Sequence, residues 1–407
     1  MVVGDDVPIT IRAYDGSRLG SADSRAELVI RSRDAFRRLV GAPGELGLAR
    51  AYVAGELDIE GDISAVLEIG DALADRRTGV RGAVAALQLA GFSVLWPLPR
   101  PPEEARLRGR LHSRARDAAA IAHHYDLSND FYEILLGPSL TYSCAVWSDE
   151  TSTLEDAQHA KHDLVGRKLG LRPGMRVLDI GSGWGSFVLH AARDFGARAV
   201  GITISQAQHD LAAKRVARSG CAAHVDVRLQ DYRDVRDGPY DAIASIGMFE
   251  HVGLARIREY FGRCHDLLRP GGRLLNHAIA RPAHEIRHGH GRRATRAGAF
   301  IDRYVFPDGE LHEVGAVVSA MQDAGFEVRH LESLREHYAR TLRCWVANLE
   351  SAWGDAVALV GEGRARVWRL YLAAAAIGFD GDRIQVHQVL GVRTRDGVSE
   401  MPLRPEF

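Results

Sequence analysis

The stretch that decides the fold class reads Val177-Leu178-Asp179-Ile180-Gly181-Ser182-Gly183-Trp184-Gly185-Ser186. Its apolar beginning predicts a buried strand, and residues 187–195 predict the helix that follows. Glycines between a strand and a helix allow a tight turn and let a ligand approach the backbone. A dinucleotide site prefers GxGxxG and an acidic residue about 20 residues further on. Here the spacing is GxGxG and the next strand ends in Thr203, which argues against a nicotinamide cofactor.

Predicted strands and helices alternate from about residue 122 to the end of the chain. The strands are expected at residues 175–180, 199–203, 225–229, 240–246 and 273–279, and the helices at 187–195, 206–219 and 256–268. Such alternation with short turns is typical of an α/β fold with a parallel, doubly wound sheet.

Three segments strengthen the cofactor hypothesis for the glycine loop. Asp179 precedes the loop, the second strand ends in the hydroxyl and amide groups of residues 201–208, and the third ends in Leu229-Gln230-Asp231-Tyr232. An acid at that last position can accept a hydrogen bond from an adenine amino group. With the turn at residues 268–274, these segments resemble the S-adenosyl-L-methionine site of Rossmann-like methyltransferases. The resemblance implies the cofactor-binding residues Tyr142, Ser143, Asp179, Gly181, Gly183, Gly185, Thr203, Gln208, Asp231 and Tyr232.

The N-terminal part predicts a smaller α+β domain at residues 1–98. A strand at 7–14 ends at the hairpin signal Asp15-Gly16, a second strand is expected at 26–31, and helices are expected at 34–40 and 64–74. Residues 99–121 form a basic linker, and residues 122–407 form the catalytic domain.

Three segments could contact a lipid surface. Residues 80–96 are apolar and end at Trp96, so they predict either a helix docked on the core or one that dips into a membrane surface. Five arginines follow between Arg106 and Arg116. They form either a solvated helix face or a patch for anionic head groups, worth about 1 kcal/mol per basic residue near the surface. The basic segment 281–298 is similarly either a lid that meets head groups or a solvated loop.

Composition excludes several classes of protein. The 407 residues carry 52 Lys and Arg against 53 Asp and Glu, a net charge of -1 that argues against a general nucleic-acid binder. No apolar run reaches the roughly 18 residues needed to span a bilayer. The first ten residues lack the pattern of a secretory signal, and the 4 cysteines form no CxxC pair. We therefore expect a cytoplasmic protein that associates peripherally with membranes.

Six further segments in the catalytic domain resemble the cyclopropane-fatty-acid-phospholipid synthase family, which includes the mycolic acid cyclopropane synthases. They are residues 122–132, 140–147, 247–253, 277–279, 300–309 and 337–342. Residues 44–58 resemble the extra N-terminal domain of the branch that acts on phospholipids, which the shorter mycolate enzymes lack.

The resemblance implies a reaction and a set of catalytic residues. The alkene of an unsaturated phospholipid acyl chain attacks the methyl group of S-adenosylmethionine, and a base then removes a proton so that a cyclopropane ring closes. The enzyme must align the reactants, exclude water and tolerate a carbocation. The family's base is bound bicarbonate, whose cradle falls on Cys144, Glu250, His277, Ile279 and Tyr338 here.

These residues and the product each have other interpretations. Taken singly, Glu250 could be a helix-terminal acid, His277 a core histidine, Tyr338 a surface aromatic and Cys144 a small hydrophobe; their joint occurrence favours the cradle. A hydride shift and proton loss would instead give a methylene-branched acyl chain, the precursor of a methyl-branched fatty acid. A non-catalytic lipid-binding relative and a methyltransferase for a soluble small molecule are disfavoured.

The sequence also bears on metal binding and assembly. The histidines of residues 281–298 have Glu285 as their one carboxylate and no cysteine, so no metal site is expected. A homodimer would gain from two weak membrane contacts. The sequence does not determine double-bond position or head-group preference.

Overall fold

The computed structural model describes residues 9–20, 23–74, 98–105, 128–288 and 298–407, with the isolated residues 96, 113, 116–117 and 120–121. The chain divides into two compact units. Unit 1 comprises Met1–Arg106, Gly298–Pro307 and Leu349–Ile377, and unit 2 comprises Leu107–Ala297, Asp308–Asn348 and Gly378–Phe407. The predicted boundary near residue 98 therefore needs correction, because two segments of the predicted catalytic domain pack with the N-terminal unit.

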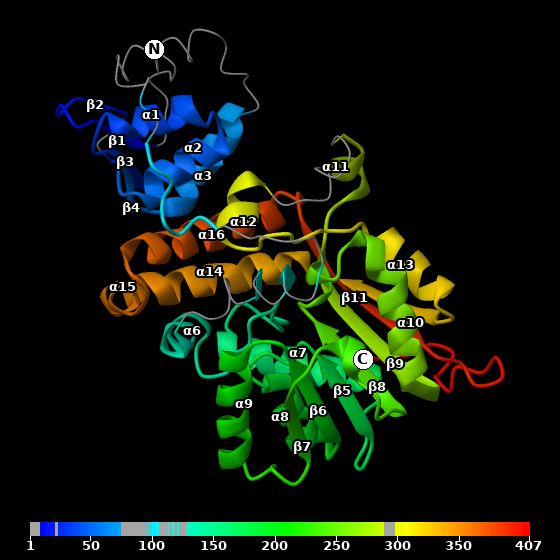
Figure 1. Cartoon of the computed structure of the whole chain (residues 1–407). Coiled ribbons are helices and arrows are strands. Elements are labelled where there is room, and N and C mark those ends of the chain that lie inside the picture. Colours follow the sequence, from blue (N-terminus) through cyan, green and yellow to red (C-terminus); the bar gives the residue numbers. More distant parts are fainter. Residues whose placement is uncertain are drawn as a thin grey trace. The chain divides into compact units, whose positions relative to one another are not determined.

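Unit 1 contains a small mixed sheet with the order β2-β1-β3-β4 (Figure 1). Its strands are β1 (Thr10–Arg12), β2 (Arg18–Leu19), β3 (Ala26–Ile30) and β4 (Leu57–Gly61). Its helices are α1 (Asp34–Gly41), α2 (Glu45–Val53), α3 (Ile63–Ala74), α12 (Ala299–Tyr304), α15 (Trp353–Val360) and most of α16 (Glu362–Asp380). The predicted Asp15-Gly16 turn joins the antiparallel strands β1 and β2, with Gly16 at φ 84°, a conformation that favours glycine.

Unit 2 is built around a seven-stranded sheet with the order β10-β11-β9-β8-β5-β6-β7. The strands are β5 (Arg176–Ile180), β6 (Arg198–Thr203), β7 (Val225–Leu229), β8 (Tyr240–Ile246), β9 (Leu268–Ala280), β10 (Glu327–Ser333) and β11 (Gln385–Val392). Strands β5 to β9 pair in parallel, as predicted. Strand β11, by contrast, pairs antiparallel with both β9 and β10, so the sheet is mixed rather than parallel throughout.

Helices cover both faces of this sheet. The helices that pack on it are α7 (Leu154–Leu169), α8 (Ser186–Phe195), α9 (Gln206–Arg218), α10 (Ile257–Leu267) and α13 (Val314–Asp323). Unit 2 also contains α6 (Asn129–Leu136), α11 (Ala283–His288) and most of α14 (Arg335–Ser351), whose last residues belong to unit 1. Short 3-10 helices occur at Tyr232–Asp234, Phe249–His251 and Leu254–Arg256. The Rossmann-like fold class is confirmed.

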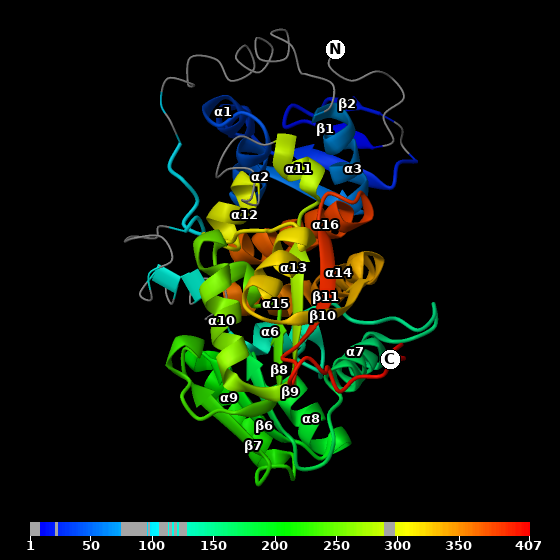
Figure 2. The same ribbon diagram turned by 90° about the vertical axis from the view of Figure 1, so that its right-hand side faces the viewer.

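Two apolar cores lie on opposite faces of the sheet, between it and the helices on either side (Figure 1). Val177 packs with α7, α8 and α9, whereas Leu178 and Ile180 pack with α10 and α13. Figure 2, turned by 90°, shows the two helix layers on either side of β8 and β9. Because side chains alternate along a strand, Asp179 shares the face of Val177 and lies beneath α7. This alternation brings a buried carboxyl group to the predicted site.

Some sequence predictions fall on residues that the structure does not describe. The apolar stretch 80–95, most of the arginine-rich segment 106–116, the family segment at 122–127 and residues 289–297 of the basic loop lie outside the described residues. Within the described residues, no helix is long and apolar enough to cross a membrane.

Candidate active site

The glycine loop joins β5 to α8 and is held against β6. The amides of Gly181 and Ser182 both donate to the carbonyl oxygen of Ile202, at 3.0 and 2.9 Å. The three loop glycines have left-handed backbone angles, with φ of 82°, 54° and 82°. A Cβ atom on Gly181 would lie 2.8 Å from Met248 Cγ, whereas one on Gly183 would meet nothing within 4 Å. The loop therefore presents bare backbone at Gly183, as the approach of a cofactor requires.

The predicted groups on β6 and β7 lie at the carboxyl ends of neighbouring strands, but they already have partners. Thr203 Oγ1 donates to Gln208 Oε1 at 2.8 Å, and both residues are buried. The carboxylate of Asp231 caps the helix at Tyr232–Asp234 and pairs with the guanidinium of Arg233 at 2.6 Å. Their role in cofactor binding stays a prediction. In open α/β sheets, ligands bind outside this carboxyl edge.

The segment that carries Tyr142, Ser143 and Cys144 is held by one face of α7. Gln158 donates from Nε2 to the carbonyl oxygens of Thr141 and Ser143, at 3.3 and 2.9 Å. Lys161 Nζ donates to Ser143 Oγ at 3.1 Å, and His162 Nε2 lies 3.1 Å from Thr141 Oγ1. Positions 158, 161 and 162 share one helix face because they are three and four residues apart.

Burial strongly perturbs the groups around this segment. Desolvation lowers the pKa of Lys161 to about 7, and the nearby carboxyl group of Asp179 opposes the shift. Desolvation likewise raises the pKa of Asp179 to about 7, against the charge of Lys161. Oδ1 of Asp179 is buried and has no hydrogen-bond partner within the described part of the chain. Lys161 and Asp179 are thus two buried titratable groups that influence each other between α7 and the cofactor loop.

The predicted base cradle contains Glu250 and Ile279 in direct contact. The amide of Ile279 donates to Glu250 Oε1 at 2.6 Å, beyond the point where β8 stops pairing with β9. This amide is therefore engaged by Glu250, a contact that the sequence did not predict. Burial raises the pKa of Glu250 to about 7, opposed by backbone hydrogen bonds from Ile279 and from Glu250 itself.

His277 lies on β9, two residues before Ile279, and is buried. Burial lowers its pKa to about 3, with smaller contributions from the charges of Lys161, Lys168 and His387. Nδ1 contacts the side-chain amide of Gln388 at 3.1 Å. Nε2 of His277 and Oε2 of Glu250 are both buried and have no hydrogen-bond partner among the described residues. A small planar acid or anion suits this pair, because one atom can donate and the other can donate or accept according to its protonation.

Cys144 and Tyr338 both donate a hydrogen bond to the carbonyl oxygen of Leu334. Cys144 Sγ donates to the carbonyl oxygen of Leu334 at 3.6 Å, and the amide of Tyr338 donates to the same oxygen at 3.1 Å. The amide of Leu334 in turn donates to Val386, which pairs with Ile279 across β11 and β9. This backbone path connects both halves of the predicted cradle. Burial raises the pKa of the Cys144 thiol well above its usual value, so it stays protonated as a weak donor.

Several buried polar residues of this region were not predicted from the sequence. They are Gln158, Lys161, Lys168, Glu310 and Gln388, all buried. Glu310 donates from its amide to the carbonyl oxygen of Glu250 at 3.1 Å and accepts from the amide of Leu254 at 2.6 Å. The sequence does show polar residues at regular spacing in α7. This pattern is also that of an ordinary amphipathic helix whose polar face is in solvent, so it does not reveal that these side chains are buried.

One group of potential metal ligands occurs in the described residues, at His159, His190 and Asp194. Asp194 already contacts His190 Nδ1 at 3.1 Å and the guanidinium of Arg193 at 3.0 Å. The group contains none of the predicted site residues. We assign it no metal.

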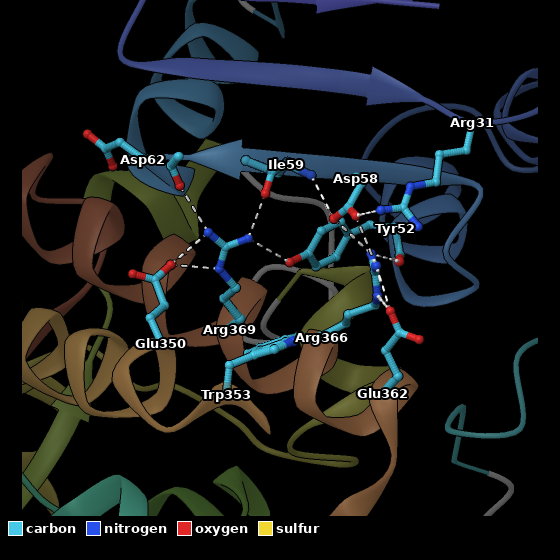
Figure 3. A pocket seen from close by; sticks show the side chains of 11 residues that line it. Arg31, Tyr52, Asp58, Ile59, Asp62, Glu350, Trp353, Glu362, Arg366 and Arg369 are labelled. Atoms are coloured by element: carbon cyan, nitrogen blue, oxygen red, sulfur yellow. Dashed lines mark hydrogen bonds and ion pairs between the residues drawn. The ribbon is translucent and has the colours of Figure 1, made fainter. Parts of the chain in front are cut away.

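A separate hollow occurs within unit 1, and no predicted site residue lines it (Figure 3). Arg366 pairs with Asp58 at 3.1 Å and with Glu362 at 2.9 Å, and Arg369 pairs with Glu350 at 2.7 Å. Tyr52 lies beneath Arg366, 5.2 Å from its guanidinium carbon to the ring centroid. These arginines are already balanced by carboxylates, so the network ties α16 to the small sheet rather than offering an anion site.

Fold and site geometry together define a class of enzyme: the chain is an S-adenosyl-L-methionine-dependent methyltransferase. It belongs to the mycolic acid cyclopropane synthetase family, whose model matches residues 112–389. The chain is similar to a probable fatty acid methyltransferase of Mycobacterium tuberculosis, with 44% identity over 98% of this chain and 94% of the relative. It is 36% identical to the tuberculostearic acid methyltransferase UfaA1 of the same organism, over 94% of this chain and 87% of that protein.

A solved structure of this family matches about two thirds of the chain. Mycolic acid cyclopropane synthase CmaA1, crystallised with SAH and CTAB, aligns with a TM-score of 0.64 and 37% identity. The alignment covers 67% of this chain and 97% of that chain. The two fatty acid methyltransferases thus match a larger share of this chain, 98% and 94%, than this shorter structure does.

Proposed function

We propose that this enzyme transfers a methylene group from S-adenosylmethionine to the double bond of an unsaturated phospholipid acyl chain and closes a cyclopropane ring. The observation that carries the proposal is the pair of buried, unpartnered atoms, Glu250 Oε2 and His277 Nε2, in the described residues of the cradle. A buried donor and carboxyl group without protein partners are costly unless a ligand completes their hydrogen bonds. The cradle therefore fits bicarbonate, which when bound would supply the base that accepts the proton.

The side chains of the cradle have distinct tasks in this proposal. His277, whose depressed pKa keeps it neutral, donates a hydrogen bond without adding a positive charge beside the carbocation. Glu250, with a pKa of about 7, is half protonated near neutrality and so holds a proton between two acidic groups. The buried Cys144 thiol stays protonated and donates to the carbonyl oxygen of Leu334, so it holds the backbone beside Tyr338 in place. Tyr338 packs on Phe379 at a centroid distance of 4.7 Å, which fixes its ring.

A second outcome of the same chemistry is favoured by the full-length relatives. The probable fatty acid methyltransferase and the tuberculostearic acid methyltransferase match nearly the whole chain. In this alternative, a hydride shift precedes proton loss, and the product is a methylene-branched acyl chain. The two outcomes share every residue of the proposed site, and both end with loss of a proton from the transferred methyl group. They differ in whether a hydride shift to the neighbouring cationic carbon comes first.

Product analysis tests both outcomes. We expect that expression in a host with monounsaturated phospholipids yields acyl chains heavier by one CH2 group in mass spectra. NMR of the purified lipid then separates ring protons from those of an exocyclic methylene. If purified enzyme with S-adenosylmethionine modified soluble amines but no acyl chain, the lipid proposal would be wrong.

A paired set of variants tests the cradle itself. Removing a positioned base typically costs 10²–10⁴-fold, so Glu250→Gln and His277→Ala should each reduce turnover by about that range. Residues that act as a unit are not additive, and the double variant should be little worse than the poorer single variant. Full turnover of Glu250→Gln in bicarbonate-depleted buffer would contradict the cradle.

The proposed phospholipid substrate lies in a membrane, so we also propose peripheral binding to anionic bilayers. Trp96, which closes the apolar segment, has 70% of its surface exposed. An exposed tryptophan beside basic residues suits a membrane–water interface.

A further inference from the structure

Lys168, at the C-terminal end of α7, extends into the interior of unit 2. Its side chain is fully buried, and its ammonium contacts the carboxylate of Glu332 and Oε1 of Gln388, the latter at 2.7 Å. An ammonium group has donors and no acceptor, so the oxygen of the Gln388 amide must face Lys168. This contact removes the usual ambiguity between the two ends of a glutamine amide.

The other end of that amide therefore faces His277. Gln388 and His277 are direct partners in the pairing of β11 with β9, and Gln388 Nε2 lies 3.1 Å from His277 Nδ1. Because Nε2 of the glutamine can only donate, Nδ1 of the imidazole must accept. A neutral imidazole that accepts at Nδ1 carries its proton on Nε2. The His277 ring stays neutral because burial and the charges of Lys161, Lys168 and His387 depress its pKa.

We propose that Lys168 and Gln388 are positioning residues that fix His277 as the Nε2–H tautomer, so that the ring offers a donor rather than a lone pair to bicarbonate. The inference rests on the proposed function for the role of His277, although the tautomer itself follows from the contacts of Lys168 and Gln388. A lone pair at this atom would be a nucleophile beside a carbocation and an electrophilic methyl group. The hydrogen bonds from Lys168 to Gln388 and from Gln388 to His277 keep a proton, rather than a lone pair, at Nε2 of His277.

Gln388→Glu reverses the direction of the hydrogen bond between residue 388 and His277 and keeps the size of the side chain. One carboxylate oxygen keeps the contact with Lys168, and the other accepts from Nδ1, which moves the proton of the neutral ring to Nδ1. Lys168→Met removes the group that orients the amide, so both tautomers become populated. Val389→Ala is the matched control, because Val389 is a buried neighbour on the same strand that belongs to the apolar core.

Nitrogen NMR of histidine-labelled enzyme measures the tautomer directly, with the His277 signal identified by its loss in His277→Gln. We expect the wild type and Val389→Ala to show a protonated Nε2. Gln388→Glu should show a protonated Nδ1 at mildly alkaline pH, and Lys168→Met a mixture. Loss of a partner that orients a functional histidine typically costs 10–100-fold, so turnover of Gln388→Glu should fall by about that factor. Affinity for S-adenosylhomocysteine should be unchanged.

The two readouts separate the inference from the function on which it rests. An unchanged Nε2–H signal in both Gln388→Glu and Lys168→Met would overturn the inference. A changed tautomer with full turnover would support the positioning role of Lys168 and Gln388 but would overturn the role of His277 in the proposed cradle. If Gln388→Glu does not fold, Lys168→Met alone still decides, because a tautomer mixture is expected only when the amide loses its orientation.

Discussion

Lys161 donates from Nζ to Oγ of Ser143 at 3.1 Å, and both side chains are buried. In the described part of the chain, no carboxylate lies within ion-pair distance of this ammonium, although Asp179 is close enough to raise its pKa. The contact links α7 to the segment that carries Cys144. It places a titratable cation between the glycine loop and the proposed cradle, because the charge of Lys161 also affects Asp179 and His277.

Replacing Lys161 by Met should therefore weaken cofactor binding more than its loss of stability explains. A hydrogen bond to a charged group contributes about 1.5–3 kcal/mol, so affinity for S-adenosylhomocysteine should fall by roughly 10-fold or more. Calorimetry on Lys161→Met, Ser143→Ala and the double variant measures the coupling. If Lys161 acts through Ser143, the double variant binds about as weakly as the poorer single variant.

Val165→Ala is the control for Lys161→Met, because it truncates a buried residue of the same helix that faces the apolar core. It should lower the unfolding temperature and leave the affinity unchanged. Equal losses of affinity in Val165→Ala and Lys161→Met would show that Lys161 serves stability alone.

Gly183→Ala should reduce cofactor affinity while the fold survives. The new Cβ meets no protein atom within 4 Å, but it projects from the loop that the cofactor is expected to approach. Gly174→Ala is a matched control, since Gly174 also has positive φ, at 82°, and open space around its Cβ. Both variants bear the strain of a left-handed residue, about 1–2 kcal/mol. Only Gly183→Ala should lose affinity for S-adenosylhomocysteine in calorimetry, and equal affinities would contradict the predicted cofactor position.

The parts of this structure that the sequence predicted are those encoded locally. The strand, glycine loop and helix at 177–195 are contiguous, so apolar periodicity and glycine placement were enough. Lys168 and Gln388 are distant in sequence, and their meeting depends on the packing of α7 against β11, which no local pattern records. The same holds for the antiparallel direction of β11, because an apolar run does not reveal its orientation. The membership of α15 and most of α16 in unit 1 is likewise a tertiary result.

The arginine-rich segment 106–116 should contribute to membrane binding. We expect that replacing Arg108, Arg110 and Arg114 by Ser weakens binding to vesicles that contain anionic lipids. The wild-type interaction should also weaken with salt, since exposed charges are screened beyond about 10 Å at 0.1 M. Vesicle co-sedimentation at low and high salt measures both effects. A triple Ser variant of the exposed residues Arg25, Arg193 and Arg258 removes the same charge elsewhere. Similar binding by both triple variants would mean that segment 106–116 is a solvated face.

Glu250 should make the enzyme less stable as pH rises, and this dependence should be absent from Glu250→Gln because glutamine does not titrate. Burial raises its pKa in the folded protein from 4.5 to about 7. The stability that protonated Glu250 contributes is therefore fully present below the pKa that this group has in the unfolded protein. It is lost as the pH rises through the pKa that the group has in the folded protein. The loss is on the order of 3 kcal/mol once the group is ionised in both states. Glutamine can still accept from the Ile279 amide, so Glu250→Gln removes the titration and keeps the hydrogen bond.

We therefore expect wild type and Glu250→Gln to have similar free energies of unfolding at about pH 5, whereas at about pH 8 the variant should be more stable. Urea denaturation at both pH values measures the difference. Asp179 also has a raised pKa of about 7, but it titrates in both proteins and cancels in the comparison. An equal pH dependence of the two proteins would mean that Glu250 ionises at its ordinary pKa. It would then be charged at neutral pH and would repel bicarbonate instead of sharing a proton with it.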